Sequence, residues 1–175
     1  FYFVSAVPQS QLGLDGHPQR TASSFMPPIP LPRRMFAGAR ITWLRPLRLG
    51  RPAERRAEIR DIQSKSGRSG DLAFVTVASQ VFQDGLLCLD EQQDIVYRTP
   101  GEKVPAPPIV ELPPLPAGTW SQTIVPDPKL LFRFSALTFN AHRIHYDRPY
   151  AADEEGYPGL VVHGPLTALL LLQLA

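Results

Sequence analysis

The sequence predicts an α+β fold built from two units, and three observations support this. Strand-like patterns fill residues 39–97, a proline-rich stretch follows at residues 105–116, and helix signals appear after residue 127. Alternation of apolar and polar residues is typical of half-buried strands, whereas apolar residues at helical spacing indicate amphipathic helices. A chain of 175 residues can bury a core as one domain or as two small ones.

Four antiparallel strands are predicted in the first unit. Residues 39–44 and 55–62 alternate, residues 72–78 form a β-branched run, and a fourth strand is expected over residues 86–97. Turn signals separate the last three segments, at residues 66–70 and at Asp84-Gly85. The pattern therefore predicts an antiparallel sheet.

The proline-rich stretch PAPPIVELPPLP predicts a linker, because proline lacks a backbone donor and favours extended geometry. We therefore expect a first unit over residues 1–104, a linker over residues 105–118 and the start of a second unit over residues 119–175. No short repeat relates the two units.

The second unit is expected to begin with a short strand at residues 122–125. Asp127-Pro128 then provides an N-cap and a first-turn proline for a helix to about Leu137. Apolar residues at helical spacing, expected to face a core, are Leu130, Leu131, Phe134 and Leu137. A second helix after Pro165 is apolar on nearly all sides, which predicts a helix buried inside a sheet.

Composition excludes several classes of protein. One cysteine, Cys88, rules out a disulfide framework and a thiolate metal cluster, and favours a reducing compartment. The apolar run near the C-terminus is too short to span a bilayer. Because the chain opens with Phe1 and ends inside an apolar run, we expect it to be incomplete at both ends. The expected location is the cytoplasm, or the mitochondrial matrix if a targeting segment is missing.

The formal charge is +2, but arginines are concentrated in the first half of the chain. They are Arg33, Arg34, Arg40, Arg45, Arg48, Arg51, Arg55, Arg56 and Arg60. Acidic residues are interleaved with them and no nucleic-acid-binding motif accompanies them. The pattern indicates a solvated strand face or contact with a phosphate-bearing small ligand, rather than with nucleic acid.

Candidate chemistry lies in the last quarter of the chain. Three histidines, His142, His145 and His163, accompany Asn140 and Asp147 there. A metal site using His142, His145 and Asp147 is one alternative, although no HExxH or CxxC motif supports it. Chance clustering of structural histidines is another.

The arrangement favours acid–base chemistry beside a carbonyl group. An imidazole such as that of His145 moves protons near neutral pH. Gly164 opens a predicted helix, whose free N–H groups and positive partial charge would polarise a thioester oxygen. Together these features suit reversible addition of water to a carbonyl-conjugated double bond.

The segments LFRFSALTFNAHRIHYDRPY and GLVVHGPLTALLLL resemble the catalytic half of a known family. This is the MaoC-like group of hot-dog-fold (R)-specific enoyl-thioester hydratases and 3-hydroxyacyl-thioester dehydratases. Its Asp-x-Asn-Pro-x-His motif falls on Asn140, His142, Arg143 and His145, and its oxyanion glycine falls on Gly164. The aspartate of the motif is thus replaced by Asn140.

Further segments are similar to one branch of this group, the type 2 hydroxyacyl-thioester dehydratases and mesaconyl-CoA hydratases. They are PQSQLGLDGHP, PLPRRMFAGARITWLRPLRLG and DEQQDIVYR in the first half of the chain. The resemblance implies two hot-dog units in one chain, each an antiparallel sheet wrapped on a central helix. The first is non-catalytic, the second catalytic.

The resemblance implies an enzyme that reversibly adds water across the 2,3-double bond of an enoyl thioester. The implied catalytic residues are Asn140, His145 and Gly164; the implied substrate-binding residues are His142, Arg143, Tyr146 and His163. Because an amide cannot exchange a proton, His145 is expected to act as base and then as acid while Asn140 orients the water. His142 has an alternative role in fixing the loop, His163 in capping the helix, and Asp147 is expected to organise the following turn.

Coenzyme A is the expected thioester carrier of the substrate, with an acyl-carrier protein as the alternative. No cofactor, metal, membrane or nucleic-acid partner is expected, and a homodimer is the expected assembly. Two other functions stay open: a hot-dog thioesterase, and a non-catalytic acyl-CoA-binding or scaffold protein.

Overall fold

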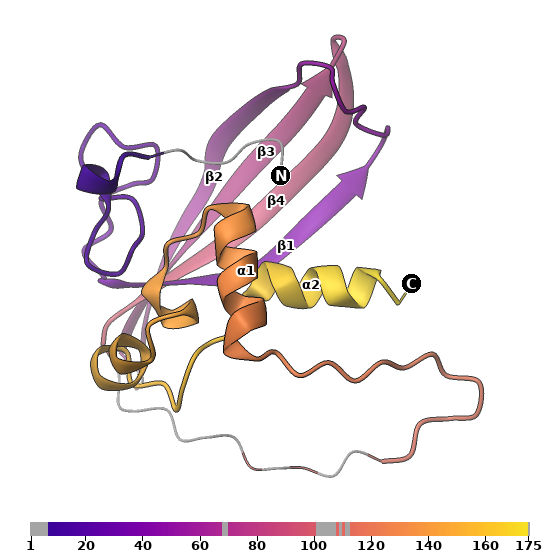
Figure 1. Ribbon diagram of the computed structural model, residues 1–175. Coiled ribbons are helices and arrows are strands. Elements are labelled where there is room, and N and C mark those ends of the chain that lie inside the picture. Colours follow the sequence, from indigo (N-terminus) through magenta and orange to yellow (C-terminus); the bar gives the residue numbers. More distant parts are fainter. Residues whose placement is uncertain (1–6, 68–69, 101–107, 109, 111–112, 175) are drawn as a thin grey trace. The chain divides into compact units, whose positions relative to one another are not determined.

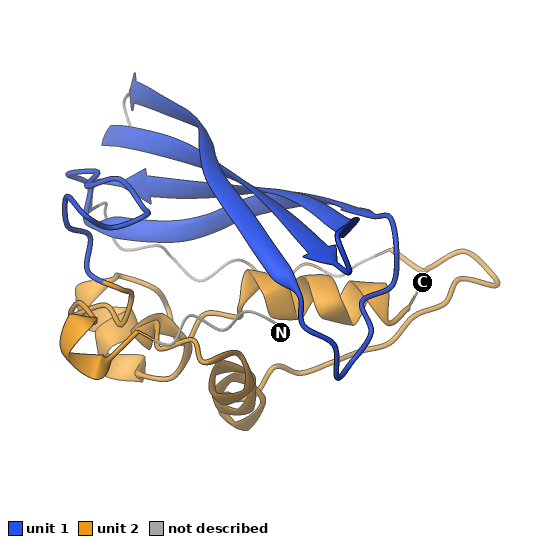
Figure 2. Ribbon diagram, turned by 90° about the horizontal axis from the view of Figure 1, so that it is seen from above, with its two compact units in different colours: residues 1–4, 19–101 blue, residues 5–18, 102–175 orange. Residues whose placement is uncertain are grey.

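The computed structural model describes residues 7–174 except residues 68–69, 101–107, 109 and 111–112. The chain forms two compact units, coloured separately in Figure 2. Unit 1 comprises Phe1–Val4 and Gln19–Gly101, and unit 2 comprises Ser5–Pro18 and Glu102–Ala175. A short N-terminal segment therefore packs with the second half of the chain.

Unit 1 is built around a four-stranded antiparallel sheet (Figure 1). Its strands are β1 (Arg33–Trp43), β2 (Glu54–Gly67), β3 (Gly70–Gln83) and β4 (Leu86–Arg98). The order is β1-β4-β3-β2, so β1 returns to pair with β4 rather than with β2. All four predicted strands are confirmed, and each is longer than the pattern marked, although β1 ends at Trp43, one residue before its predicted end.

The core of unit 1 lies on one face of the sheet. Side chains alternate between faces along a strand, so every second residue of β3 and β4 points into this core. The buried residues are Ala73, Val75, Val77, Ile95 and Tyr97, with Met26, Ile29, Leu31 and Ile59 packed against them. The Asp84-Gly85 turn is confirmed, with positive φ at both residues (53° and 76°), as a two-residue hairpin turn requires.

Unit 2 consists of short helical elements joined by irregular chain. They are η1 (Gln9–Gln11), α1 (Pro128–Thr138), the 3₁₀ turn η2 (Arg143–His145), the π-helical turn η3 (Tyr150–Glu154) and α2 (Gly164–Leu172). The predicted strand at residues 122–125 is wrong, because this segment is irregular. Its β-branched residues favour extended backbone, but a strand also needs a hydrogen-bonded neighbour, and the described residues of unit 2 form no sheet.

Helix α1 begins where its sequence predicts. The Asp127 carboxylate accepts a hydrogen bond from the Leu130 N–H at 2.9 Å, and Pro128 occupies the first turn. Leu131 and Phe134 are buried, as expected, but Leu137 is 73% exposed. Leu130, on the same apolar stripe, is only half-buried. The predicted core position of Leu137 is therefore wrong.

Helix α2 is present, but the described residues of unit 2 leave it largely exposed rather than buried inside a sheet as predicted. Leu166 packs against Leu131 and Phe134, whereas Leu171 and Leu172 are 64% and 61% exposed. A helix that is apolar on all sides needs cover on all sides, and the described residues of unit 2 supply no strand to wrap it. Among the described residues, no helix has the length and apolarity needed to cross a bilayer.

Candidate active site

All four histidines of the chain form one continuous row of rings in unit 2. The ring centroids of His17 and His142 lie 4.0 Å apart, and those of His142 and His145 lie 5.3 Å apart, edge to face. The rings of His145 and His163 stack at 3.6 Å with an interplanar angle of 20°. The structure thus brings together the three histidines predicted from the sequence and adds a fourth.

The C-terminal end of α1 positions His142 in this row, with Asn140 beside it. Phe139 adopts a left-handed conformation (φ 52°), and the Asn140 N–H returns to the Ser135 carbonyl at 2.9 Å. The Asn140 side-chain oxygen then accepts a hydrogen bond from the His142 N–H at 3.0 Å. Helix cap and side-chain turn together fix the direction of the loop.

His145 lies buried in η2 with a defined tautomer. Its Nδ1 lies 2.7 Å from the Val161 carbonyl oxygen, which can only accept, so Nδ1 carries the proton and Nε2 presents a lone pair. Burial lowers the pKa of His145, and the charge of His17 lowers it further. The hydrogen bond to the Val161 carbonyl raises the pKa but does not outweigh burial. The ring is therefore neutral at pH 7 and able to act as a base at Nε2.

His163 connects the row to both helices. It is the N-cap residue of α2, but its side chain reaches α1 instead, with Nε2 2.8 Å from the Ser135 hydroxyl. The side chain is 1% exposed, and burial, assisted by the charge of His145, lowers its pKa to about 4. Gly164 follows as the first residue of α2, where backbone N–H groups lack helical partners.

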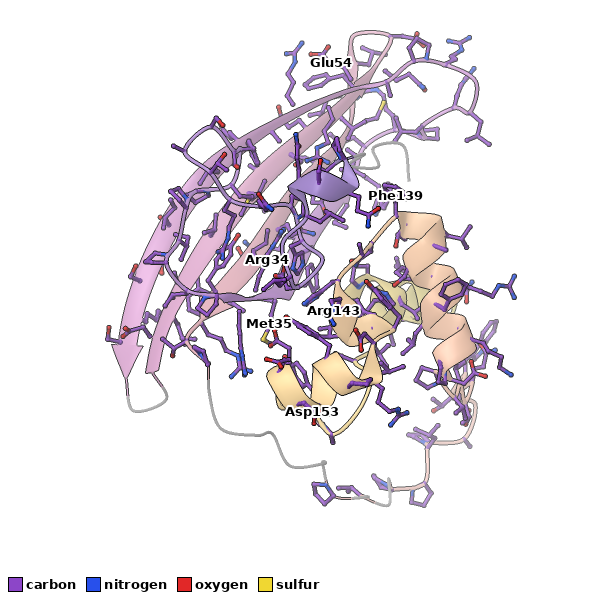
Figure 3. All side chains as sticks on the ribbon, turned by 60° about the vertical axis from the view of Figure 1, so that its left-hand side comes forward. Arg34, Met35, Glu54, Phe139, Arg143 and Asp153 are labelled. Carbon is purple, nitrogen blue, oxygen red and sulfur yellow. The ribbon has the colours of Figure 1, made fainter. Side chains whose placement is uncertain are left out.

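Arg143 and Asp147 organise the turn after Asn140. The guanidinium of Arg143, a residue labelled in Figure 3, donates to one Asp147 oxygen from Nε and Nη2, at 3.0 and 2.7 Å. It also lies 4.1 Å from the centre of the Tyr150 ring. Hydrogen bonds from Arg143 hold the pKa of Asp147 below its usual value. Asp147 also accepts from the Tyr150 N–H, which confirms its expected role in the turn. The Tyr146 hydroxyl donates to the Ala141 carbonyl at 3.0 Å.

Sequence reasoning missed Asp15, His17 and Ser135 as members of this site. The Asp15 carboxylate accepts from the backbone N–H of His17 at 3.0 Å and lies 2.9 Å from its Nδ1. The Asp-Gly-His sequence marks a turn, but nothing local indicates that this turn packs beside residues 141–145. Ser135 is an ordinary helix residue until the fold sets it beside His163.

One group of described residues has donor atoms suited to a metal ion. Donor atoms of Asp15, His17 and His142 lie within 4.8 Å of one another. The set weighed from the sequence, His142, His145 and Asp147, is differently engaged: His145 Nδ1 bonds to Val161 and Asp147 pairs with Arg143. Carboxylate and imidazole are acceptable ligands for several divalent ions, so the identity of an ion is not set by these residues alone.

Comparison with known sequences identifies the family to which the chain belongs. The sequence pattern of the hydroxyacyl-thioester dehydratase type 2 family matches residues 1–175. The mesaconyl-C(4)-CoA hydratase of Chloroflexus aurantiacus is 67% identical over 175 residues, covering 100% of this chain and 61% of that protein. The mitochondrial hydroxyacyl-thioester dehydratase type 2 of Schizosaccharomyces pombe is 28% identical over 193 residues, covering 98% and 63%. The chain thus spans about three fifths of the length of these relatives.

Solved structures show the same fold. HtdX from Mycobacterium tuberculosis superposes with a TM-score of 0.57 at 22% identity, covering 79% of this chain and 53% of that one. The full-length peroxisomal multifunctional enzyme type 2 from Drosophila melanogaster gives a TM-score of 0.52 at 20% identity, covering 77% and 25%. The likeness establishes a hot-dog-like α+β fold.

Proposed function

Because the chain belongs to the hydroxyacyl-thioester dehydratase type 2 family, we propose that it carries the catalytic groups of an acyl-thioester hydratase and dehydratase. The reaction is reversible addition of water across the 2,3-double bond of an enoyl-CoA. The 67% identity to a mesaconyl-C(4)-CoA hydratase favours a mesaconyl-CoA-like acyl group. The observation that carries this proposal is the bond from His145 Nδ1 to the Val161 carbonyl, which leaves Nε2 free to accept a proton.

In the hydration direction, His145 Nε2 accepts a proton from water as the water oxygen bonds to C3 of the substrate. The displaced π electrons develop negative charge on the thioester oxygen. The Gly164 N–H, aided by the N-terminal dipole of α2, stabilises that charge; one such donor typically contributes about 3 kcal/mol. Asn140 orients the water, since its amide exchanges no proton.

The remaining candidate residues divide by how their side chains are held. Arg143 pairs with Asp147, and His163 bonds to Ser135, so we assign these two to positioning the loop and helix. His142 and Tyr146 are assigned to substrate contact. His142 lies edge-on to the ring of His145, and Tyr146 is exposed on the same turn.

We also propose a double hot-dog architecture, with the sheet of unit 1 in a first unit and α1 and α2 in a second, catalytic one. The exposed leucines of α2 support this, because the central helix of a hot-dog unit is wrapped by a sheet. A homodimer is the expected assembly.

A substrate screen on the full natural protein tests the function. Crotonyl-CoA, mesaconyl-CoA and longer enoyl-CoA thioesters are offered, and loss of the ultraviolet absorbance of the conjugated double bond is followed. We expect hydration of at least one, fastest with the mesaconyl group, and at least 100-fold slower turnover in His145→Gln with an unchanged circular dichroism spectrum. Release of free thiol with the double bond intact would indicate a thioesterase, and tight binding without turnover a scaffold; both contradict the proposal.

A further inference from the structure

We propose that His17, held by Asp15, is a second catalytic residue of this site: the general acid that delivers the proton to C2 of the substrate. The inference rests on the proposed hydratase function. Adding water requires one proton to be removed at the water oxygen and one to be delivered at C2. His145 can perform the first step, and the amide of Asn140 can perform neither.

Asp15 and His17 form a carboxylate–imidazole pair. Asp15 Oδ2 lies 2.9 Å from His17 Nδ1, and Oδ1 accepts the backbone N–H of the same residue at 3.0 Å. An ionised carboxylate only accepts, so Nδ1 donates to it and Nε2 is the atom that gains or loses a proton. This is the geometry by which a carboxylate orients a catalytic imidazole and stabilises its protonated form.

The electrostatics of the pair agree with that role. Burial acts to raise the pKa of Asp15, but the hydrogen bonds and charge of His17 outweigh it, so the pKa is lowered and the carboxylate stays ionised. The side chains of His17 and Asp15 are 21% and 25% exposed, partly desolvated yet open to a small molecule. A charged His17 in turn lowers the pKa of His145, which keeps that ring in its basic form.

The pair is fixed against the loop that carries the other site residues. Gly16 has φ +86°, and a Cβ atom at this position would collide with the Ala141 carbonyl. The Asp15 carbonyl accepts the Arg143 N–H at 2.9 Å, and the Leu14 carbonyl accepts Arg143 Nη1 at 3.0 Å. The Asp15–His17 turn is therefore clamped to residues 141–143, with the His17 ring 4.0 Å from that of His142.

The reaction balances with two histidines. His145 Nε2 takes a proton from water as the oxygen lone pair forms the C3–O bond, and the π pair moves toward the thioester oxygen. The resulting enolate pair then forms the C2–H bond with the proton of His17 Nε2, and His17 becomes neutral. The enzyme resets when the proton gained by His145 leaves to solvent and His17 regains one. Dehydration runs the same steps backwards, with His17 removing the C2 proton.

The titratable and charged groups around His17 come from three further places besides its own turn. They are Asp15 in the turn, His142 after α1, Arg143 and His145 in η2, and Tyr150 in η3. Burial beside Glu155 raises the pKa of Tyr150 to about 12, so this phenol stays neutral over the working range.

Two variants and a matched control test the assignment in the full natural protein. His17→Asn keeps a side-chain N–H for Asp15 but carries no transferable proton. We expect kcat to fall at least 100-fold with KM within a few-fold, and a matching fall in deuterium incorporation at C2 in D2O. In Asp15→Asn, kcat and deuterium incorporation at C2 should also fall with KM near wild type, because the imidazole loses the carboxylate that orients it. The control Asp153→Asn removes an exposed acid of the same unit, labelled in Figure 3, and should match wild type.

The outcomes separate this inference from the function on which it rests. A folded His17→Asn protein with wild-type kcat and wild-type deuterium incorporation at C2 overturns the inference alone. If that variant does not fold, wild-type kcat and deuterium incorporation in folded Asp15→Asn overturn it instead. Wild-type activity that is lost to a chelator and restored by zinc would show that Asp15, His17 and His142 hold a metal, and would also overturn it. A wild-type protein inactive on every enoyl-CoA overturns the proposed function itself.

Discussion

Oδ1 of Asn140 accepts the backbone N–H of His142, and the Asn140 N–H in turn closes the last turn of α1. The residue therefore fixes the loop through one side-chain atom and leaves Nδ2 as the donor that can hold a water molecule. In the proposed mechanism, the loop structure and the chemistry depend on different atoms of the same amide. Substitutions can separate the two contributions.

Asn140→Ala removes both atoms. We expect it to lower the free energy of unfolding by about 1 kcal/mol, the usual contribution of one such hydrogen bond, and to lower kcat with KM near wild type. Asn140→Asp keeps the acceptor for the His142 N–H and should recover the stability. Urea unfolding and steady-state kinetics on the two variants measure these effects, and a wild-type kcat in Asn140→Ala would remove this residue from the chemistry.

At the scale of the element, the C-terminus of α1 shows how the loop is aimed. The Phe139 and Asn140 N–H groups return to the Ala136 and Ser135 carbonyls, a cap that requires the left-handed conformation at Phe139. Glycine adopts this conformation without strain, whereas a side chain disfavours it. The strained residue directly precedes Asn140, as strained backbone often does at functional sites.

Phe139→Gly should therefore stabilise the protein. Its side chain is exposed, so little packing is lost, and relief of the left-handed strain is offset in part by the greater flexibility of glycine in the unfolded chain. The net gain expected is about 0.5–1 kcal/mol. Thermal and denaturant unfolding measure it, with Phe139→Ala as the control that keeps the strain. Equal or lower stability of the glycine variant would show that the Phe139 ring contributes packing greater than its exposure indicates.

Local signals account for the elements that could be predicted. Asp127 and Pro128 mark the start of α1, and Asp84-Gly85 specifies the turn between β3 and β4, because each feature depends on a few neighbouring residues. Burial depends on what packs against an element. The apolar sequence of α2 therefore identified the helix but not the exposure of Leu171 and Leu172.

At the scale of the whole molecule, the same distinction applies to the site. His142, His145 and His163 were found because they lie close together in the sequence. His17 joins them only through the tertiary approach of the Asp15–Gly16 turn to Ala141. No spacing rule connects residue 17 with residue 142, so the fourth histidine and its carboxylate could be assigned only from the fold.

The two units also differ in how they should respond to acid. Every histidine belongs to unit 2, and unit 1 has none. Unfolded His163 takes up a proton near the ordinary pKa of 6.5, whereas folded His163 does so only near 4. The unfolded state therefore binds more protons between these values, and stability is lost as pH falls through this window. Through His163 alone, the free energy of unfolding falls by about 3 kcal/mol across this window. His145, whose pKa is also lowered, acts in the same direction.

We therefore expect unit 2 to open before unit 1 as pH falls from 7 toward 4.5. The carboxylates with lowered pKa in unit 1, Glu54 and Asp94, lose their partners only at still lower pH. Hydrogen exchange followed by mass spectrometry, corrected for the intrinsic effect of pH, should show loss of protection in α1 and α2 while β3 and β4 stay protected. His163→Gln keeps an amide for Ser135 but does not titrate, so it should reduce the loss in α1 and α2. Simultaneous exposure of both units, or loss in the sheet first, would show that the buried histidines do not set the acid response.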